Sequence, residues 1–136
     1  MPYKNKTLAT ALALSLGGLG AHRFYLYGGI DKVGMLHACS LPAAGLVYSQ
    51  TAGGVDVFYA LLPLLVSYIA AFLSALVIGL TPDEKWDAVF NAGAPRTQSS
   101  WILAVLLVAT LMVGATVLIA TISRLFDLMY TGGAYG

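Results

Sequence analysis

The stretch that decides the fold is Gly17-Gly18-Leu19-Gly20-Ala21-His22-Arg23-Phe24-Tyr25-Leu26-Tyr27-Gly28. It follows a short apolar run, from Leu8 to Leu16, and interrupts that run with a cation, three aromatic residues and several glycines. Arginine can pair with headgroups or water, and phenylalanine and tyrosine rings favour the membrane interface. The pattern therefore indicates a helix that leaves lipid at Arg23.

The composition of the chain also indicates a membrane. Of its 136 residues, 59% are hydrophobic and 10% are charged, whereas soluble domains contain about 25% charged residues. So few charges could not surround a water-exposed core of this size. The net charge of +1 gives no indication of a nucleic-acid partner. The single cysteine, Cys39, excludes an intrachain disulfide.

The N-terminal segment has two interpretations. Lys4 and Lys6 ahead of an apolar run are also typical of a secretory signal peptide. Cleavage after Ala21 would place Leu19 at a position that prefers a small residue. We therefore expect the segment to be retained.

Four apolar segments are predicted: Thr7 to about Ala21, Val33 to Gly54, Val57 to Leu80, and Trp101 to Ile122. The third and fourth are uncharged and exceed the roughly 20 residues that a span requires. The first spans only if residues 24–27 continue it or the bilayer thins locally. The second contains Pro42 and is either a kinked span or a re-entrant stretch packed against protein. The short, glycine-containing links after the first two segments predict antiparallel neighbours.

The third link predicts a short helix near residues 82–91. Thr81-Pro82-Asp83-Glu84 is typical of a capping box with proline at the first helical position. Trp86, Val89 and Phe90 share one face, which predicts an interfacial helix anchored by Trp86 and Phe90. The alternative is a turn whose tryptophan packs on the bundle. Ser99 or Ser100 is expected to cap the fourth span, ahead of a further interfacial anchor, Trp101.

The basic residues do not fix the orientation of these segments. Four spans would place three basic residues on one side and four on the other, and three spans would reverse the counts. We expect the N-terminus inside, because basic residues ahead of a first span often stay in the cytoplasm.

Small residues recur at four-residue spacing in two segments. The first stripe is Ala9, Ala13, Gly17 and Ala21, and the second is Ser67, Ala71, Ala75 and Gly79. Small residues at this spacing let helices approach closely in lipid, within one chain or with a partner. The alternative is chance in an alanine-rich sequence.

No residue pattern predicts catalysis or a metal site. A turn separates His22 from His37, and Cys39 lies on a different helix face from His37. We expect no catalytic residue, no metal, no cofactor and no soluble small-molecule substrate, so the chain is predicted not to be an enzyme. His37 is expected to be a polar core group bonded to a backbone carbonyl, and as the one ionisable residue near mid-depth it does not favour a pump.

Charged residues flank the apolar segments. Asp31 is expected to cap the second helix. Arg23, Asp31, Lys32 and Asp56 either form an ion-pair cluster at one membrane surface or are solvated separately. Arg124 and Asp127, at i and i+3, mark the exit of the fourth segment.

The segment from Lys4 to Gly28 resembles the TM2 domain family, a two-helix membrane hairpin with an Asp- or His-Arg-Phe-Tyr-Leu-Gly sequence in its short connection. In this sequence the resemblance makes His22, Arg23, Phe24, Tyr25 and Leu26 the signature residues. It covers about residues 4–56 and implies a membrane protein without an established enzymatic activity. Tyr27 intervenes before Gly28, and the segment from Val33 to Gly54 is less uniformly apolar than the second family helix.

These observations predict an all-α, multi-pass integral membrane helical bundle with 3–4 transmembrane helices. Residues 1–56 form a TM2-like hairpin, and residues 57–136 form two further transmembrane helices joined by an interfacial loop-helix. The residues expected to form the motif and its interface are Gly17, Gly20, His22, Arg23, Phe24, Tyr25, Asp31 and Lys32.

The expected role is that of a non-catalytic accessory, assembly or stabilising subunit of a larger membrane complex. Its partners would be membrane lipids and other integral membrane subunits, in the bacterial inner membrane. One alternative is a small homo-oligomeric channel or transporter. Another is a lipid or membrane-stress sensor that binds anionic headgroups through Arg23 and Lys32.

Overall fold

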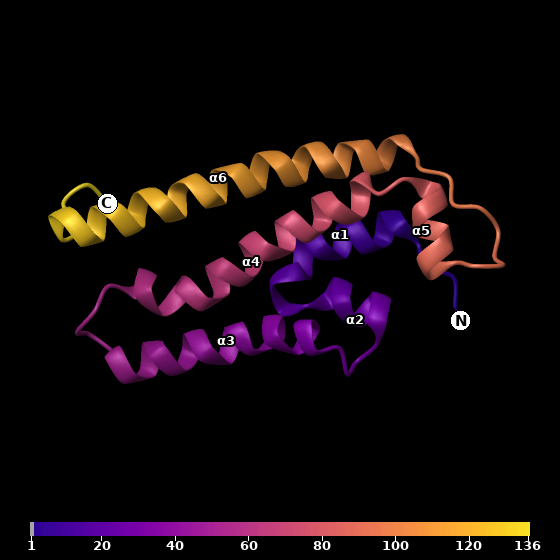
Figure 1. Cartoon of the computed structure of the whole chain (residues 1–136). Helices are drawn as coiled ribbons and strands as arrows, with labels where there is room; N and C mark the ends of the chain where they lie inside the picture. The colour runs from indigo at the N-terminus through magenta and orange to yellow at the C-terminus, as the bar shows by residue number, and fades with distance from the viewer. Residues whose placement is uncertain (1) are drawn as a thin grey trace.

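The computed structural model describes residues 2–136 and contains helices and no strand in that range. The elements are α1 (Lys6–Leu16), the 3₁₀ turn η1 (Gly17–Leu19), α2 (Ala21–Tyr27), α3 (Lys32–Thr51), α4 (Val57–Leu80), α5 (Asp83–Phe90) and α6 (Trp101–Thr131). The long helices α6, α4 and α3 lie side by side in that order, and α1, α2 and α5 gather toward the end that holds the N-terminus (Figure 1).

The first apolar segment is not one helix, which corrects the prediction of a continuous segment from Thr7 to Ala21. α1 ends at Leu16, η1 follows, and Gly20 has a φ of 83° that reverses the chain. α2 then runs back along α1, and Lys4 Nζ donates to the carbonyl oxygen of Tyr25 at 2.6 Å. Because α1 has 11 residues, it is about 17 Å long. The segment is a short hairpin, termed here the α1–α2 hairpin (Figure 1).

The second apolar segment is a continuous helix rather than a re-entrant stretch. α3 has 20 residues and contains Pro42 within its length. Its N-cap is Asp31, as predicted, with a carboxylate oxygen accepting from the Gly34 backbone N–H at 2.7 Å. A re-entrant stretch would reverse the chain within residues 33–54, but the reversal lies in the first segment, at Gly20.

The third and fourth segments are the two helices in residues 2–136 that are long and apolar enough to cross a membrane. α4 has the predicted limits, and α6 begins at Trp101 as predicted but continues to Thr131. Arg124 lies within this extension and pairs with Asp127 at 2.8 Å and with Asp56, which precedes α4, at 2.8 Å. The extension of α6 therefore holds the far end of α4.

The predicted short helix forms as α5, but its caps differ from those expected. Thr81 is not part of a capping box, since its hydroxyl donates to the Val77 carbonyl of α4 at 2.6 Å. Pro82 is the N-cap of α5 rather than its first residue, and Ser100 precedes α6 without a side-chain cap bond. The Ser99 hydroxyl instead donates to Asp83 at 2.5 Å.

Close packing of small residues forms the core around α4, which contacts α1, α3 and α6. Ala9 and Ala13 of α1, and Ala71 and Ala75 of α4, are fully buried, so the two stripes face each other. The Cβ of an alanine at Gly17 would lie 2.6 Å from the Ala71 Cβ, so the backbones approach more closely there than a side chain allows. Ser67 and Gly79 of the second stripe are also buried, whereas Ala21 lies beyond the chain reversal, on α2.

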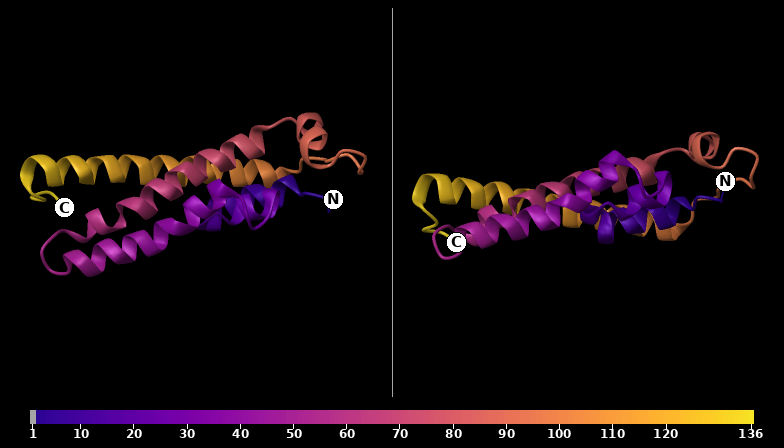
Figure 2. Two further views of the ribbon diagram at one scale, coloured as in Figure 1. Left: turned by 60° about the horizontal axis from the view of Figure 1, so that its bottom comes forward. Right: turned by 90° about the horizontal axis from the view of Figure 1, so that it is seen from below.

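Basic residues are concentrated at one end of the molecule. The N-terminal segment, the α2–α3 link, α5 and the loop after α5 gather toward that end, and the last turns of α6 form the other end (Figures 1 and 2). The end that holds the N-terminus carries six basic residues: Lys4, Lys6, Arg23, Lys32, Lys85 and Arg96. The end formed by the last turns of α6 carries Arg124. This grouping arises because α2 returns Arg23 and Lys32 toward the end that holds Lys4.

Candidate functional site

The signature residues form the turn and the returning arm of the α1–α2 hairpin. Gly20, at its turn, combines a φ of 83° with a close approach to α3, where an added Cβ would lie 2.5 Å from the Gly34 carbonyl oxygen. Both conditions require glycine. Phe24 lies against α3 in the same region, with its ring 2.8 Å from where a Gly34 Cβ would be. The hairpin is therefore fitted to the first turn of α3.

A small polar cluster surrounds the Gly18 carbonyl at the hairpin turn. The oxygen accepts from Ser67 Oγ at 2.7 Å and from Ser40 Oγ at 3.2 Å. His37 Nδ1 lies 2.7 Å from Ser67 Oγ. Since the single hydroxyl proton of Ser67 goes to Gly18, Nδ1 is the donor of the His37–Ser67 bond. The partner of His37 is thus a hydroxyl group rather than the predicted backbone carbonyl.

His22 is buried rather than placed at the membrane interface with Arg23. Its side chain is 0% exposed, and its ring centroid lies 5.5 Å from that of His37 in an edge-on arrangement. Neither ring nitrogen has a hydrogen-bond partner among residues 2–136. A buried polar group without a partner is unfavourable, which makes His22 the exceptional residue of the hairpin.

Arg23 forms a two-point ion pair with the cap of the next helix. Its Nε and Nη2 donate to the two Asp31 carboxylate oxygens, each at 2.9 Å. The Arg23 guanidinium lies 4.2 Å from the Tyr27 ring centroid. The Arg23 bonds and the Gly34 N–H hold the pKa of Asp31 below its usual value. Part of the predicted ion-pair cluster therefore forms.

The other two members of that predicted cluster lie elsewhere. Asp56 pairs with Arg124 at the opposite end of the molecule. Lys32 is exposed and makes no ion pair with residues 2–136. The α2–α3 link thus carries one ion pair and one exposed cation.

Tyr25 joins the hairpin to the segment ahead of α1. Its hydroxyl oxygen accepts from the Asn5 backbone N–H at 2.8 Å, and its ring lies 4.9 Å from Lys4 Nζ. The sequence indicated an aromatic residue at an interface. It gave no signal for the contacts with Lys4 and Asn5, which lie far from Tyr25 in the chain.

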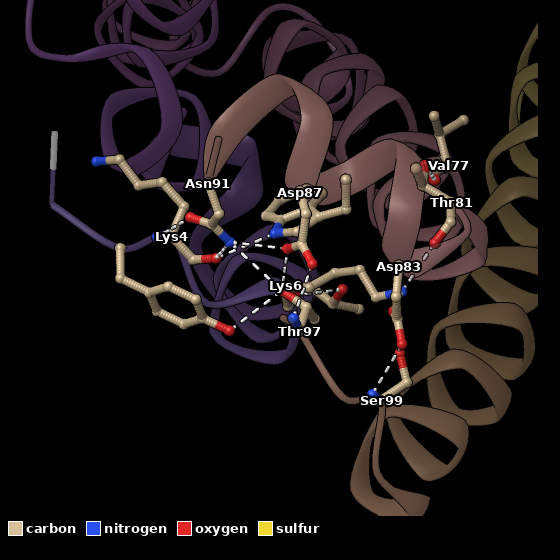
Figure 3. A network of polar contacts seen from close by, with 12 residues as sticks. Lys4, Lys6, Val77, Thr81, Asp83, Asp87, Asn91, Thr97 and Ser99 are labelled. Atoms are coloured by element: carbon tan, nitrogen blue, oxygen red, sulfur yellow. Dashed lines mark hydrogen bonds and ion pairs between the residues drawn. The ribbon is translucent and has the colours of Figure 1, made fainter. Parts of the chain in front are cut away.

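A second polar network, which sequence reasoning missed, fastens the N-terminal segment to α5 (Figure 3). Lys6 Nζ donates to Asp83 Oδ1 at 2.5 Å and to the Thr81 carbonyl at 2.8 Å. The Lys6 side chain is only 4% exposed. Lys6, followed by the Ser99 hydroxyl, lowers the pKa of Asp83 to about 2. Lys6 is thus a buried structural cation rather than a flanking charge.

Asn91 holds the backbone of Lys4 in the same network (Figure 3). Its Oδ1 accepts from the Lys4 N–H at 2.7 Å, and its Nδ2 donates to the Lys4 carbonyl at 3.0 Å. The Trp86 indole N–H donates to that carbonyl at 3.0 Å. Bonds from Thr97 lower the pKa of Asp87, which also accepts from Asn91 at 3.2 Å.

The aromatic residues expected as interfacial anchors differ in exposure. Trp86 is 2% exposed and packs on the bundle, as in the alternative interpretation of this helix. Phe90 packs against Trp86 with the ring centroids 4.4 Å apart and the ring planes tilted by 41°. Trp101 is 76% exposed at the start of α6.

The comparisons with known proteins agree with the signature residues. Residues 2–49 match the TM2 domain family, which confirms the resemblance first identified there. The match includes α1, α2 and most of α3 and ends before α4. No curated protein and no solved structure gives a significant match to the chain. Together with the two apolar helices, this similarity of residues 2–49 to the TM2 domain indicates a membrane protein.

Proposed function

We propose that this protein is a non-catalytic accessory subunit that assembles with, or stabilises, a larger complex of integral membrane proteins. Its membrane topology is three spans, α3, α4 and α6, with the α1–α2 hairpin entering the bilayer part-way and returning. α3 is less apolar than α4 and α6, but its 20 residues, about 30 Å, match a hydrocarbon core, whereas α1 is too short to cross. The polar His37 and Ser40 of α3 are buried and bonded within the bundle rather than exposed to lipid. Backbone that is not α-helical is tolerated inside a bilayer where protein covers it. The turn of the hairpin meets this condition, since Gly17 and Gly18 are buried against α4.

The basic residues support an orientation with the N-terminus inside. With three spans, six of the seven lysines and arginines lie on the N-terminal side, and Arg124 lies on the other. Short cytoplasmic segments carry an excess of lysine and arginine. We infer that the N-terminus, the α2–α3 link and α5 face the cytoplasm, in a bacterial inner membrane.

The single observation that carries the accessory role is the open surface of α6. Among its 31 residues, Leu103 and Thr110 are the buried ones. α6 packs on α4 and α1 along one side, and side chains such as Val108 and Met112 project away from the bundle with more than half their surface exposed. Ala104 and Ala109 line a shallow groove beside Val108 on this face. Small residues let helices approach closely in lipid, so α6 is the proposed docking helix for another membrane subunit.

The polar residues of the chain support a structural role. Ser67 and Ser40 bond the Gly18 carbonyl, and His37 bonds Ser67. Lys6 and Asp83 fasten α5 to the N-terminal segment. These groups hold the hairpin and α5 in place, which suits a protein that presents a fixed surface to a partner.

Recovery from native membranes in a mild detergent tests the accessory role. We expect a tagged full-length chain to co-purify with stoichiometric integral membrane subunits identified by mass spectrometry. Val108→Trp on α6 should reduce their recovery, whereas Leu36→Trp on the exposed face of α3 should not. Recovery solely as a self-oligomer, or equal effects of the two substitutions, would contradict docking through α6.

The α1–α2 hairpin favours a second candidate, a small homo-oligomeric channel. Re-entrant segments with polar groups at their turns are a recurring feature of pores, and Ser67 and His37 lie at this turn. Ion or solute flux into liposomes holding the purified protein, altered by Ser67→Ala, would support the channel over the accessory subunit.

A further inference from the structure

A cavity of about 450 Å³ lies between α2, α4 and α5. This volume falls within the range of about 300–1,000 Å³ that is typical of ligand pockets. Its α4 wall is largely apolar, with Leu73, Val77 and Ile78 beside Ser74, and its α5 wall carries Trp86 and Phe90. Leu73 and Val77 are 61% and 69% exposed, so the apolar wall continues out of the cavity onto the surface of α4.

The charged residues that line this cavity are both cations. Arg23 and Lys85 line it, and no carboxylate does. Lys85 is exposed and makes no hydrogen bond or ion pair with residues 2–136. Asp31 occupies Nε and Nη2 of Arg23, so Nη1 keeps its two N–H donors. The lining thus complements an anion with several acceptor oxygens.

His22 lies at the base of the same cavity. Its side chain is 0% exposed, and its Nδ1 lies 3.4 Å from where a Gly17 Cβ would be, so the ring offers no hydrogen-bonding group to a ligand in the cavity.

The order of these groups along α4 matches the structure of a lipid. Val77 and Leu73 lie one turn apart, and α4 runs away from α5 toward the middle of the proposed bilayer. Lys85 and Arg23 lie on the segments at the cationic end (Figure 1). A molecule bound here would place its anionic part at the cations and an apolar chain along Val77 and Leu73.

We propose that the cavity between α2, α4 and α5 binds one anionic phospholipid of the leaflet on the N-terminal side. The proposal rests on the orientation proposed above. The lipid phosphate lies between Lys85 and Arg23 Nη1, and the first part of an acyl chain follows Val77 and Leu73.

Native mass spectrometry of the full chain in mild detergent tests this site. The probes are phosphatidylglycerol and phosphatidylcholine with identical acyl chains. We expect one phosphatidylglycerol molecule to be retained in preference to phosphatidylcholine. Because a lysine near a membrane surface contributes about fivefold to anionic-lipid binding, Lys85→Gln should weaken retention by about that factor.

Two further variants make the lipid assay specific to the cavity. Lys32→Gln removes an exposed cation from the same end outside the cavity and should leave retention unchanged. Val77→Trp fills the apolar wall and should abolish retention, with helix content by circular dichroism showing that the protein is folded. Equal effects of Lys85→Gln and Lys32→Gln, equal retention of the two lipids, or lipid still bound to folded Val77→Trp would overturn the proposal.

Inorganic phosphate distinguishes a lipid from a free anion. Millimolar phosphate should leave the bound lipid in place, because the acyl chain contributes to binding, and displacement by phosphate would overturn the lipid assignment. The lipid assay is independent of partner recovery. A bound lipid without co-purifying subunits contradicts the accessory role alone, and co-purifying subunits without a bound lipid contradict the lipid site alone.

Discussion

Replacing Lys6 with methionine should destabilise the protein by about 2–3 kcal/mol. Methionine keeps the length of the apolar stem but removes the ammonium group that bonds Asp83 and the Thr81 carbonyl. A hydrogen bond to a charged group contributes about 1.5–3 kcal/mol, and breaking a buried ion pair costs about 3–5 kcal/mol. Because the Asp83 side chain is 31% exposed and keeps its bonds to Ser99, we expect a value near the lower range.

Unfolding in mixed micelles with a rising fraction of a denaturing detergent measures this free energy. The fluorescence of Trp86 is the signal, since its indole bonds Lys4 at this end of the molecule. Trp101, which is largely exposed, is replaced by phenylalanine in every variant. The matched control is Lys32→Met, an exposed cation whose loss should change stability by less than about 0.5 kcal/mol.

The double variant with Asp83→Asn separates the ion pair from other effects of the Lys6 substitution. Groups in contact show coupling energies of about 0.5–3 kcal/mol, and we expect at least about 1 kcal/mol for Lys6 and Asp83. A Lys6→Met effect no larger than that of Lys32→Met, or strictly additive single effects, would refute the assignment of Lys6 as a structural cation.

Three other predictions concern the same architecture. Gly20→Ala should destabilise by about 2–4 kcal/mol because left-handed backbone strain of about 1–2 kcal/mol adds to overpacking against the Gly34 carbonyl. Gly132→Ala, at another left-handed glycine, with a φ of 71° and open space around it, should show the strain alone, and equal losses in micelle unfolding would contradict the close approach. Gly45→Ala should stabilise α3 by about 0.5–1 kcal/mol, since nothing lies within 4 Å of the added Cβ, and a loss of stability would show that this face is not open. The bound Lys6 lowers the pKa of Asp83 to about 2. The stabilisation from ionised Asp83 is therefore complete above the unfolded pKa of about 3.8 and is lost as the pH falls from there through about 2. Unfolding midpoints measured against pH should lose this decrease at low pH in Asp83→Asn, and an unchanged profile would contradict the shift.

The long helices could be predicted from the sequence because their signals are local. The limits of α4 follow from an uncharged, largely apolar run between Asp56 and Thr81. The N-cap of α3 also follows from neighbouring residues, since Asp31 bonds an N–H three residues later. The length of α6 was underestimated because Arg124 resembles the end of a span, whereas its partner Asp56 lies far away in the sequence.

The α1–α2 hairpin could not be predicted because its geometry depends on contacts with distant residues. The glycines from Gly17 to Gly20 marked a break, but the return of α2 requires Gly20 to meet Gly34 and Gly17 to meet Ala71. An apolar run as long as the one from Leu8 to Leu16 suits either a short span or one arm of a hairpin. Lys4 and Lys6 were interpreted as flanking charges for the same reason, because Asn91 and Asp83 lie far along the chain.

The side of the membrane on which the α2–α3 link lies tests whether residues 6–27 form a hairpin that returns or a segment that crosses. Single cysteines at Tyr3, Gly29 and Gly54, in a Cys39→Ser background, are labelled with a membrane-impermeant thiol reagent in intact cells and in inverted vesicles. The α1–α2 hairpin predicts that Tyr3→Cys and Gly29→Cys react from the same side and Gly54→Cys from the opposite side. Labelling of Tyr3→Cys and Gly29→Cys from opposite sides would show that the first segment crosses the membrane and would contradict the α1–α2 hairpin.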